Sequence, residues 1–388
     1  MKFKRVFLMV LDSLGVGEAD DAATYNSKGS NTLGHIKDNT DLFIPNLAKI
    51  GLLNTINMDE NLDVDAYYTM AKPNNIGKDS LNGHYEIMGI SSSEVFKTFN
   101  EGFPNELLNE IERITGRKVI GNKCGSSIDI INELGELEQN YGSLIVYTSA
   151  DSDLQIAAHE DVIPVATLYK YCERVRELTL RGEWRVGRVI ARPFNGKPGH
   201  YKLSNVSRRD YSIKPPKKTL LSEMIENKYN VIGIGKVNDI FNDNEINKNI
   251  KVSNNQEAIN KLLTLMDKKF TGLCMVNLDD FDSEFGHNRD VEGYKNALEE
   301  LDVEIPIILN KLEIDDLLII TADHGNDPTF EGNDHTRENV PVIFYSLSFN
   351  KPHMLSPLSS FGSIGATIAD NFDLQKTELG ISVLEELE

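Results

Sequence analysis

The fold class is decided by the stretch LLIITADHGND, residues 317–327. Its apolar run is typical of a parallel strand that helices cover on both faces, and α/β proteins place their ligand sites at the carboxyl ends of such strands. Because the run leads into Asp323 and His324, it predicts two metal ligands at that edge of a sheet. Asp-His-Gly-Asn-Asp is also favourable in a surface turn, so the motif alone leaves a purely structural role open.

Two other apolar runs end in the same way. Residues 6–11 lead into Asp12, and residues 272–278 lead into an acidic segment that contains Asp282 and His287. The carboxyl ends of parallel strands lie at one edge of a sheet. We therefore expect these side chains to lie close to the acid and the histidine of the first stretch.

A further histidine, His335, follows His324 by eleven residues in a segment without helical periodicity, and we expect it on a loop. The candidate ligands are thus three carboxylates and three imidazoles: Asp12, Asp282, Asp323, His287, His324 and His335. Oxygen and nitrogen donors without a thiolate favour manganese or zinc over calcium or magnesium. Six donors suit two divalent cations, and such a pair stabilises the attacking and leaving oxygens of a phosphoryl transfer.

The segment GKDSLNGHYEIMG, residues 77–89, offers an acceptor for the phosphoryl group. Gly77-Lys78-Asp79 is typical of a turn, and we expect a helix from Leu81 onward. The Ser80 hydroxyl would then lie at a helix N-terminus, where free N–H groups favour an anion, so we predict Ser80 as the nucleophile. An ordinary N-cap serine is the alternative.

Length and composition set the broad class. With 388 residues the chain exceeds one usual hydrophobic core, so we expect two domains, and alternating helical and strand patterns favour an α/β protein. Three scattered cysteines support neither a disulfide framework nor a zinc knuckle. No segment approaches the ~20 apolar residues of a membrane helix, and the short run before Asp12 does not fit a signal peptide. We expect a cytoplasmic protein.

The charge is acidic overall but unevenly distributed. Sixty Asp and Glu against 40 Lys and Arg give a net charge of −20, which disfavours nucleic-acid and membrane partners. Between Lys170 and Lys218, however, 14 Lys and Arg accompany only 4 Asp and Glu. We expect two or three of these cations to bind a small phosphorylated substrate, and many of the others to form a solvated basic surface.

Several more motifs bear on the function. They are NTLGHI at 31–36, EGFP at 101–104, GNK at 121–123, YTSADS at 147–152 and GRVIARPF at 187–194. Together with the ligand segments they resemble the phosphopentomutases, a branch of the alkaline phosphatase superfamily, over most of the chain. The metal ligands alone fit phosphatases, sulfatases and phosphoglycerate mutases equally, whereas the last two motifs look like the substrate-handling segments of this mutase.

The resemblance implies an alkaline-phosphatase-like α/β fold, with a central, mostly parallel sheet flanked by helices and an inserted α+β cap domain. The metal-binding core would comprise residues 1–95 and 216–388, and the cap residues 96–215. One ion would be held by Asp12, Asp323 and His324, and the second by Asp282, His287 and His335.

The resemblance also implies contacts to the substrate phosphate and sugar from Asp151, Arg188, Arg192, Lys202, Lys236 and His84. The chain departs from the family at two of its functional positions. The family usually has threonine in place of Ser80, and serine keeps the hydroxyl but lacks the methyl group that restricts χ1. It typically has an arginine near Lys202, and lysine offers a point charge in place of a bidentate fork.

The activity implied is the interconversion of ribose 1-phosphate and ribose 5-phosphate, or of the 2-deoxyribose phosphates, through phosphorylated Ser80 and a bisphosphate intermediate. Two manganese ions and activation by a sugar bisphosphate such as glucose 1,6-bisphosphate are expected, without an obligate protein partner. Two alternatives stay open. One is a phosphatase or a metal-dependent phosphoglycerate mutase of the same superfamily. The other is a sugar-phosphate-binding relative without turnover, which the replacement of threonine by serine would suit.

Overall fold

The structure is a computed structural model that describes the chain except for residues 93–95, 150–151, 181 and 242–244. The chain divides into two compact units. The core unit comprises Met1–Glu94 and Pro215–Glu388, and the inserted unit comprises Val95–Lys214. Each boundary lies one residue from the one expected from the sequence.

The core unit is built around a sheet of seven strands within the described residues. In spatial order they are β10 (Lys248–Ile250), β9 (Asn230–Ile234), β11 (Gly272–Leu278), β1 (Arg5–Leu11), β12 (Asp316–Thr321), β13 (Val340–Tyr345) and β2 (Tyr67–Ala71). Neighbouring strands are parallel from β10 to β12, whereas β13 pairs antiparallel with β12 and β2. The expected central, mostly parallel sheet is confirmed.

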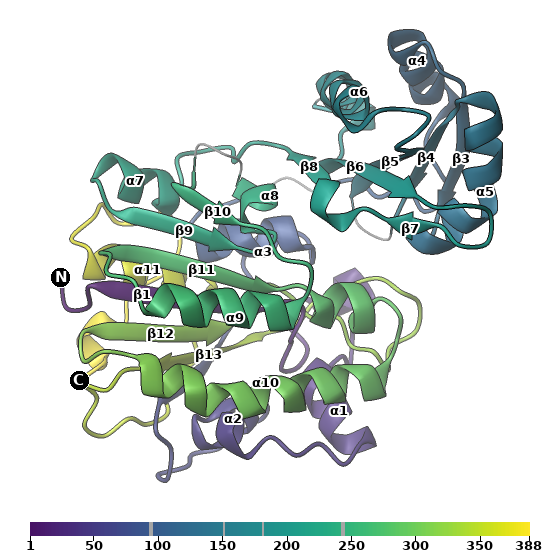
Figure 1. Ribbon diagram of the computed structural model, residues 1–388. Coiled ribbons are helices and arrows are strands. Elements are labelled where there is room, and N and C mark those ends of the chain that lie inside the picture. The colour runs from purple at the N-terminus through teal and green to yellow at the C-terminus, as the bar shows by residue number, and fades with distance from the viewer. Residues whose placement is uncertain (93–95, 150–151, 181, 242–244) are drawn as a thin grey trace. The chain divides into compact units, whose positions relative to one another are not determined.

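The three strands that precede predicted ligands lie side by side in this sheet (Figure 1). β1 pairs in parallel with β11 on one side and with β12 on the other, with Leu11 opposite Leu278 and Val10 opposite Thr321. Every residue of the three strands is buried, as their continuous apolar runs predict. Because they end in register, the residues that follow them meet at one edge.

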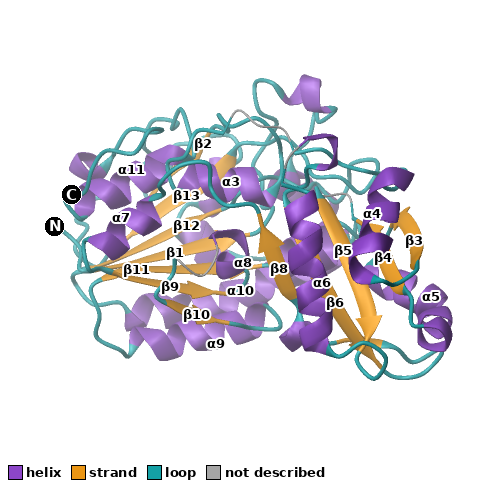
Figure 2. Cartoon of the chain, turned by 90° about the horizontal axis from the view of Figure 1, so that it is seen from above, coloured by secondary structure: helices purple, strands orange, loops and turns teal. Residues whose placement is uncertain are grey.

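Helices flank the core sheet, as expected. The α-helices of this unit are α1 (Thr32–Asn39), α2 (Pro45–Lys49), α3 (Ser80–Ile87), α7 (Leu220–Glu226), α8 (Val237–Phe241), α9 (Asn255–Met266), α10 (Val291–Lys311) and α11 (Gly362–Asn371). Helices α9 and α10 lie side by side on one face of the sheet, and α3 and α11 lie on the other (Figure 1 and Figure 2). Short helical turns complete it: η1 (Ala22–Tyr25), η2 (Leu52–Thr55), η6 (Leu384–Glu386) and a π-helix, η5 (Phe281–Gly286).

The inserted unit has its own mixed sheet. Its described strands are β3 (Val119–Cys124), β4 (Leu144–Thr148), β5 (Asp153–His159), β6 (Arg188–Asn195) and β7 (Lys202–Leu203) in spatial order, with β8 (Arg209–Ser212) also paired to β6. Its helices are α4 (Asn105–Thr115), α5 (Ser127–Tyr141), α6 (Val165–Leu178), η3 (Gly182–Trp184) and η4 (Asn205–Ser207). Parallel and antiparallel pairs occur together.

Alternate residues of these strands enter two separate cores, as the two-residue period of a strand requires. Leu144 and Val146 of β4 pack with apolar residues of α4 and α6. Ile145 and Tyr147 pack with apolar residues of α5. The unit is therefore a sheet covered by helices on both faces, and the predicted α/β fold with an inserted α+β body is confirmed.

Among the helices that the structure describes, none has both the length and the apolar character needed to cross a bilayer.

Candidate active site

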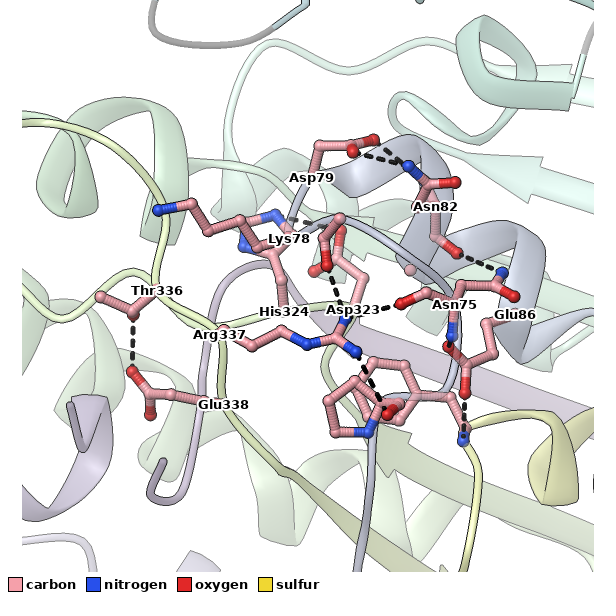
Figure 3. Close-up of a pocket in the computed structure, with 14 residues that line it drawn as sticks. Asn75, Lys78, Asp79, Asn82, Glu86, Asp323, His324, Thr336, Arg337 and Glu338 are labelled. Atoms are coloured by element: carbon pink, nitrogen blue, oxygen red, sulfur yellow. Dashed lines mark hydrogen bonds and ion pairs between the residues drawn. The ribbon is translucent and has the colours of Figure 1, made fainter. Parts of the chain in front are cut away.

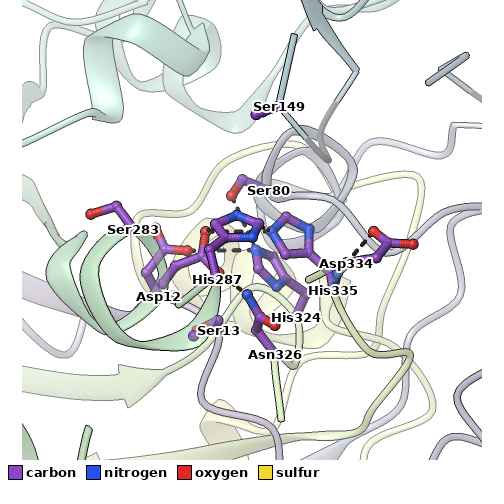
Figure 4. Close-up of polar contacts among 12 residues, drawn as sticks. Asp12, Ser13, Ser80, Ser149, Ser283, His287, His324, Asn326, Asp334 and His335 are labelled. Atoms are coloured by element: carbon purple, nitrogen blue, oxygen red, sulfur yellow. Dashed lines mark hydrogen bonds and ion pairs between the residues drawn. The ribbon is translucent and has the colours of Figure 1, made fainter. Parts of the chain in front are cut away.

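The six predicted metal ligands gather at the carboxyl edge of the core sheet. Asp12 directly follows β1, Asp323 comes shortly after β12, and Asp282 lies in the π-helix that follows β11. His335 lies on a loop, as expected. The three imidazole rings lie next to Asp12 and Ser80 (Figure 4). All six side chains are buried apart from His287, which is partly exposed.

Asp282, His287 and His335 form the first of two groups able to hold a metal ion. Nε2 of His335 lies 3.2 Å from Nε2 of His287. Oδ2 of Asp282 lies 3.2 Å from the His287 nitrogen and 3.4 Å from the His335 nitrogen. Each Nδ1 faces a main-chain carbonyl oxygen, that of Asn333 for His287 and that of Lys78 for His335. An Nδ1–H that donates to a carbonyl leaves the Nε2 lone pair directed at its neighbours. Two such lone pairs beside a carboxylate suit a bound cation.

Asp12, Asp282 and His324 form the second group, so Asp282 belongs to both. Nε2 of His324 lies 3.5 Å from Oδ1 of Asp12, and its Nδ1 lies 3.0 Å from the carbonyl oxygen of Gly325. Asp323, expected to hold the same ion, places Oδ2 3.5 Å from His324 Nε2. The predicted ligands of the two ions therefore form one continuous cluster.

The donor atoms fit divalent cations in two further respects. Within the part of the chain that the structure describes, Asp12 Oδ1 is buried and accepts no hydrogen bond, and Asp323 Oδ2 is buried with the His84 imidazole 3.0 Å away. A buried carboxylate oxygen without a donor costs free energy unless a cation satisfies it. Carboxylate oxygens combined with imidazole nitrogens also suit manganese or zinc better than calcium.

The charges of the imidazoles and carboxylates in this cluster shift one another's pKa values. Burial opposes the charge of Asp282, but the two adjacent imidazoles hold its pKa well below the usual value. Burial likewise opposes protonation of His324, yet Asp323 raises the pKa of that imidazole well above the usual value. Burial and the neighbouring Asp323 raise the pKa of Asp12. A cation that binds such a site replaces these protons.

Ser80 is the first residue of α3, and Asp79 is the N-cap, since Oδ1 of Asp79 accepts a hydrogen bond from Asn82 N at 3.0 Å. The alternative that Ser80 merely caps the helix is wrong. Oγ of Ser80 lies 3.1 Å from Nε2 of His324 and 3.1 Å from Nζ of Lys236. A hydroxyl in the first turn of a helix also lies close to free N–H groups, which favour an anion.

Lys236, predicted to contact phosphate, places a positive charge beside this hydroxyl. Its ammonium forms an ion pair with Oδ2 of Asp12 and lies 2.9 Å from Oδ1 of Asp279. Burial opposes the charge, but Asp12 and Asp279 raise the pKa of Lys236 well above the usual value. The side chain is therefore a fixed cation next to Ser80.

His84, also predicted to contact phosphate, is fully buried behind the cluster. Its Nδ1 lies 2.8 Å from the carbonyl oxygen of Ser80 and 3.0 Å from Oδ2 of Asp323. Its Nε2 lies 3.1 Å from Oδ1 of Asn277. Both ring nitrogens thus face protein acceptors, and the ring connects the Ser80 segment to the cluster of predicted metal ligands.

Two amides that orient the carboxylates were not predicted. Asn277 Nδ2 donates to Asp12 Oδ2 at 2.7 Å, and Asn326 Nδ2 donates to Asp282 Oδ1 at 2.8 Å. The sequence could have indicated a role for Asn277, because it is the one strongly polar residue in the apolar run of β11. Nothing in the sequence sets Asn326 apart, since asparagine is common in turns such as the one after this strand.

The turn before Ser80 is held by buried charges beside a small cavity of about 10 Å³, which holds roughly one water molecule (Figure 3). Arg337 donates to the carbonyl oxygens of Asn75, at 2.7 Å, and Gly77. Glu86 accepts a hydrogen bond from the main-chain N–H of Asn75 at 2.7 Å. These contacts fix the turn from which α3 begins.

The other predicted substrate contacts belong to the inserted unit. Arg188 and Arg192 lie on β6, four residues apart, and Lys202 is exposed on β7. Asp151 lies outside the described residues. Arg192 Nε donates to Oε1 of Gln155 at 2.8 Å, and burial together with the nearby Arg208 lowers the pKa of Arg192.

Part of the basic segment is engaged within the inserted unit. Arg208 makes two 2.8 Å hydrogen bonds to Asp210, and Arg188 lies 3.7 Å from the same carboxylate. Burial opposes the charge of Asp210, but Arg208 and Arg188 lower its pKa to about 2. Arg176 donates to main-chain carbonyl oxygens, including that of Val186 at 2.9 Å. The expectation of a mainly solvated basic surface does not hold for these side chains.

The α/β fold and the clustered carboxylates and imidazoles define a metal-dependent protein of the alkaline-phosphatase-like class. The family model described as the Metalloenzyme superfamily matches residues 4–376, so the chain belongs to that superfamily.

Solved structures with partial similarity to the chain come from several organisms. The PH0037 protein from Pyrococcus horikoshii is 13% identical, covers 97% of this chain and 99% of its own, and has a TM-score of 0.49. Phosphoglycerate mutase from Leishmania mexicana is 12% identical, with coverages of 98% and 97% and a TM-score of 0.49. An alkaline phosphatase superfamily protein from Vibrio parahaemolyticus is 10% identical, with coverages of 97% and 68% and a TM-score of 0.45.

Proposed function

We propose that the chain is a phosphopentomutase, which interconverts the 1- and 5-phosphates of ribose or 2-deoxyribose through phosphorylated Ser80. The observation that carries the proposal is the position of Ser80 Oγ, 3.1 Å from both His324 Nε2 and Lys236 Nζ in the first turn of α3. Phosphoryl transfer depends mainly on positioning and on neutralising the charge of the phosphoryl oxygens. A serine hydroxyl in these surroundings suits a phosphoryl carrier.

Two divalent cations, for which we propose manganese, complete this site. Asp282, His287 and His335 would hold one, and Asp12, Asp323 and His324 would hold the other. When bound, such a pair neutralises the developing charge on the phosphoryl oxygens.

In the proposed transfer, a sugar hydroxyl oxygen bonds to the phosphorus of phosphoserine while the bond from phosphorus to Ser80 Oγ breaks. Ser80 takes up the proton that the sugar hydroxyl gives up, and Lys236 stabilises the negative charge that develops on Oγ. The sugar then carries two phosphates. Transfer of the other phosphate back to Ser80 restores phosphoserine, so the net reaction is an isomerisation.

Recognition of the sugar phosphate is proposed to involve the inserted unit. Arg188 and Arg192 lie on one face of β6, since residues four apart in a strand point the same way, and Arg208 is close enough to lower the pKa of Arg192. Asp210 balances part of this charge, and the guanidinium charge that remains suits the phosphate that is not transferred. The similarity of segments 147–152 and 187–194 to phosphopentomutases supports a pentose phosphate as the substrate.

The test is to incubate the protein with manganese, glucose 1,6-bisphosphate and ribose 1-phosphate, and to follow both ribose 5-phosphate and free phosphate by phosphorus NMR. We expect isomer without release of phosphate. Ser80→Ala should abolish the reaction, whereas Ser80→Thr, which keeps the hydroxyl, should retain it.

Other outcomes would identify the alternatives. Rapid release of phosphate without isomer would indicate a phosphatase, and turnover of 3-phosphoglycerate in place of ribose 1-phosphate would indicate a phosphoglycerate mutase. A protein that binds ribose 5-phosphate but never acquires phosphate on Ser80 would be a binding protein. Each of these results would overturn the proposal.

A further inference from the structure

A second cavity lies in the core unit, apart from the residues assigned to the metal ions and the nucleophile. It has a volume of about 250 Å³ and lies between the N-terminal end of α9, the π-helix η5 and the middle of α10. Drug-sized ligands usually occupy pockets of roughly 300–1,000 Å³, so this cavity suits a smaller molecule. The proposed reaction does not use it.

The inner wall of the cavity is apolar. Ile259 of α9, Leu278 at the end of β11, Phe281 and Phe285 of the π-helix and Leu301 of α10 line it. All of these side chains are buried except Phe285, which is partly exposed. The wall therefore favours the hydrophobic part of a ligand over water.

The charged lining residues are acidic, and the other polar ones, Asn254, Asn255 and Gln256, are neutral amides. Asp280 and Glu300 contribute carboxylates, and none of the described lining residues is lysine, arginine or histidine. A ligand with a positive charge would be attracted to this part of the cavity.

Asp280 is held in place by hydrogen bonds to the start of α9. Asp280 Oδ2 accepts a hydrogen bond from Asn255 N at 2.8 Å, and Asn255 Oδ1 accepts one from Asp280 N at 3.1 Å. This reciprocal pair joins the end of β11 to the start of α9. The carboxylate is thus pre-organised at a fixed position beside the apolar wall, which reduces the entropy lost when a ligand binds.

We propose that this cavity binds a small organic cation, a protonated amine carried on a short hydrophobic body. The hydrophobic body would contact Ile259, Phe285 and Leu301, and the ammonium group would donate to Asp280 and Glu300. A neutral molecule of the same shape would gain only the apolar contacts, and an inorganic cation would gain only the charge.

The experiment uses the full chain loaded with manganese and measures binding of 2-phenylethylamine and of its neutral counterpart 2-phenylethanol by titration calorimetry at pH 8. We expect the amine to bind at least tenfold more tightly than the alcohol. Ala297→Leu, which adds atoms to the cavity lining, should weaken the amine at least tenfold, and Glu300→Gln should reduce the preference for the amine.

Glu292→Gln is the matched control, because Glu292 is an exposed acid on the same helix that does not line the cavity. It should leave both affinities unchanged, and thermal unfolding of each variant shows that the fold is retained. Equal binding of amine and alcohol, no binding of either, or an Ala297→Leu protein that is folded and binds the amine normally would each overturn the proposal.

Discussion

At Asn277, a single buried amide links two parts of the candidate active site. Its nitrogen donates to Asp12, and its oxygen lies 3.1 Å from Nε2 of His84, which in turn contacts Asp323. A carboxylate that is already oriented loses less entropy when it binds a cation. The amide should therefore control the affinity of the site for metal although it is not itself a ligand.

Asn277→Ala should weaken binding of manganese roughly 10- to 100-fold, the usual effect of removing a residue that orients a ligand. Titration calorimetry with the metal-free protein measures this, and the melting temperature without metal shows whether the fold survives. Asn230→Ala, at an exposed position at the start of β9, is the control. An unchanged affinity in folded Asn277→Ala protein would show that the amide does not position Asp12 for metal.

At the scale of elements, the candidate active site depends on a close approach between α3 and the end of β12. Gly83 lies against the main chain of Asp323, and a Cβ atom there would come within 2.0 Å of the Asp323 carbonyl oxygen. The backbone cannot move aside as a flexible side chain can. The absence of a side chain at Gly83 is what lets the helix carry Ser80 close to His324.

Gly83→Ala should therefore displace α3, lowering the free energy of unfolding by about 1–3 kcal/mol and reducing phosphorylation of Ser80. Chemical denaturation and mass spectrometry of the Ser80 peptide measure the two effects. Gly125→Ala is the matched control, since the nearest atom there is the end of a flexible side chain, Ile130 Cδ1, at 3.3 Å. If Gly83→Ala were as stable and as readily phosphorylated as this control, the close approach would not matter.

The sequence predicted the strands of the site better than the turns. The apolar runs of β1, β11 and β12 mark buried parallel strands, and the acids after them mark the edge of the sheet where the predicted ligands lie. The π-helix η5 was not predicted, because its residues were recognised only as an acidic segment that follows a strand. Its Phe281 packs against Tyr294 of α10, with ring centroids 5.3 Å apart. Such a contact leaves no local pattern.

At the scale of the whole molecule, charge counting predicted where cations concentrate but not what they contact. Arg208 and Arg188 balance the buried Asp210, and Arg176 satisfies main-chain carbonyl oxygens, so these residues stabilise the inserted unit. Composition gives the number of charges in a segment and not their partners. The division into two units agrees with the sequence-based bounds to within one residue at each boundary. The sheet of the inserted unit has an apolar core of its own.

Metal binding should stabilise the whole protein. The cluster brings several carboxylates together in a buried site, and a cation that binds only the folded state adds about 2.7 kcal/mol at a free concentration of 100 times Kd. Manganese should raise the melting temperature by several degrees, and EDTA should reverse the change. His335→Ala, which removes one donor, should lose much of the increase. A melting temperature that manganese leaves unchanged would contradict this.

Glu138 should make the stability of the inserted unit depend on pH. Burial raises the pKa of Glu138 from an ordinary value of 4.5 to about 7. Between these values the folded chain binds more protons than the unfolded chain, so the free energy of unfolding should fall as the pH rises through this window. Below this pH window, the contribution of Glu138 to the free energy of unfolding is fully present.

Glu138→Gln stays neutral and keeps an oxygen able to accept the hydrogen bond from His159 N. Its melting temperature should exceed that of the unmodified protein by several degrees at pH 8, and the two should agree near pH 4. Glu136→Gln, an exposed acid on the same helix, is the control and should show no such difference. A constant difference across the pH range would mean that Glu138 does not titrate in this window.

The most direct measurement of the central claim is anomalous diffraction from crystals grown with manganese, recorded on both sides of the manganese absorption edge. We predict two peaks next to Ser80 Oγ, one among Asp282, His287 and His335 and the other among Asp12, Asp323 and His324. Peaks remote from Ser80, or no peak at these residues when manganese is present in excess, would contradict the account.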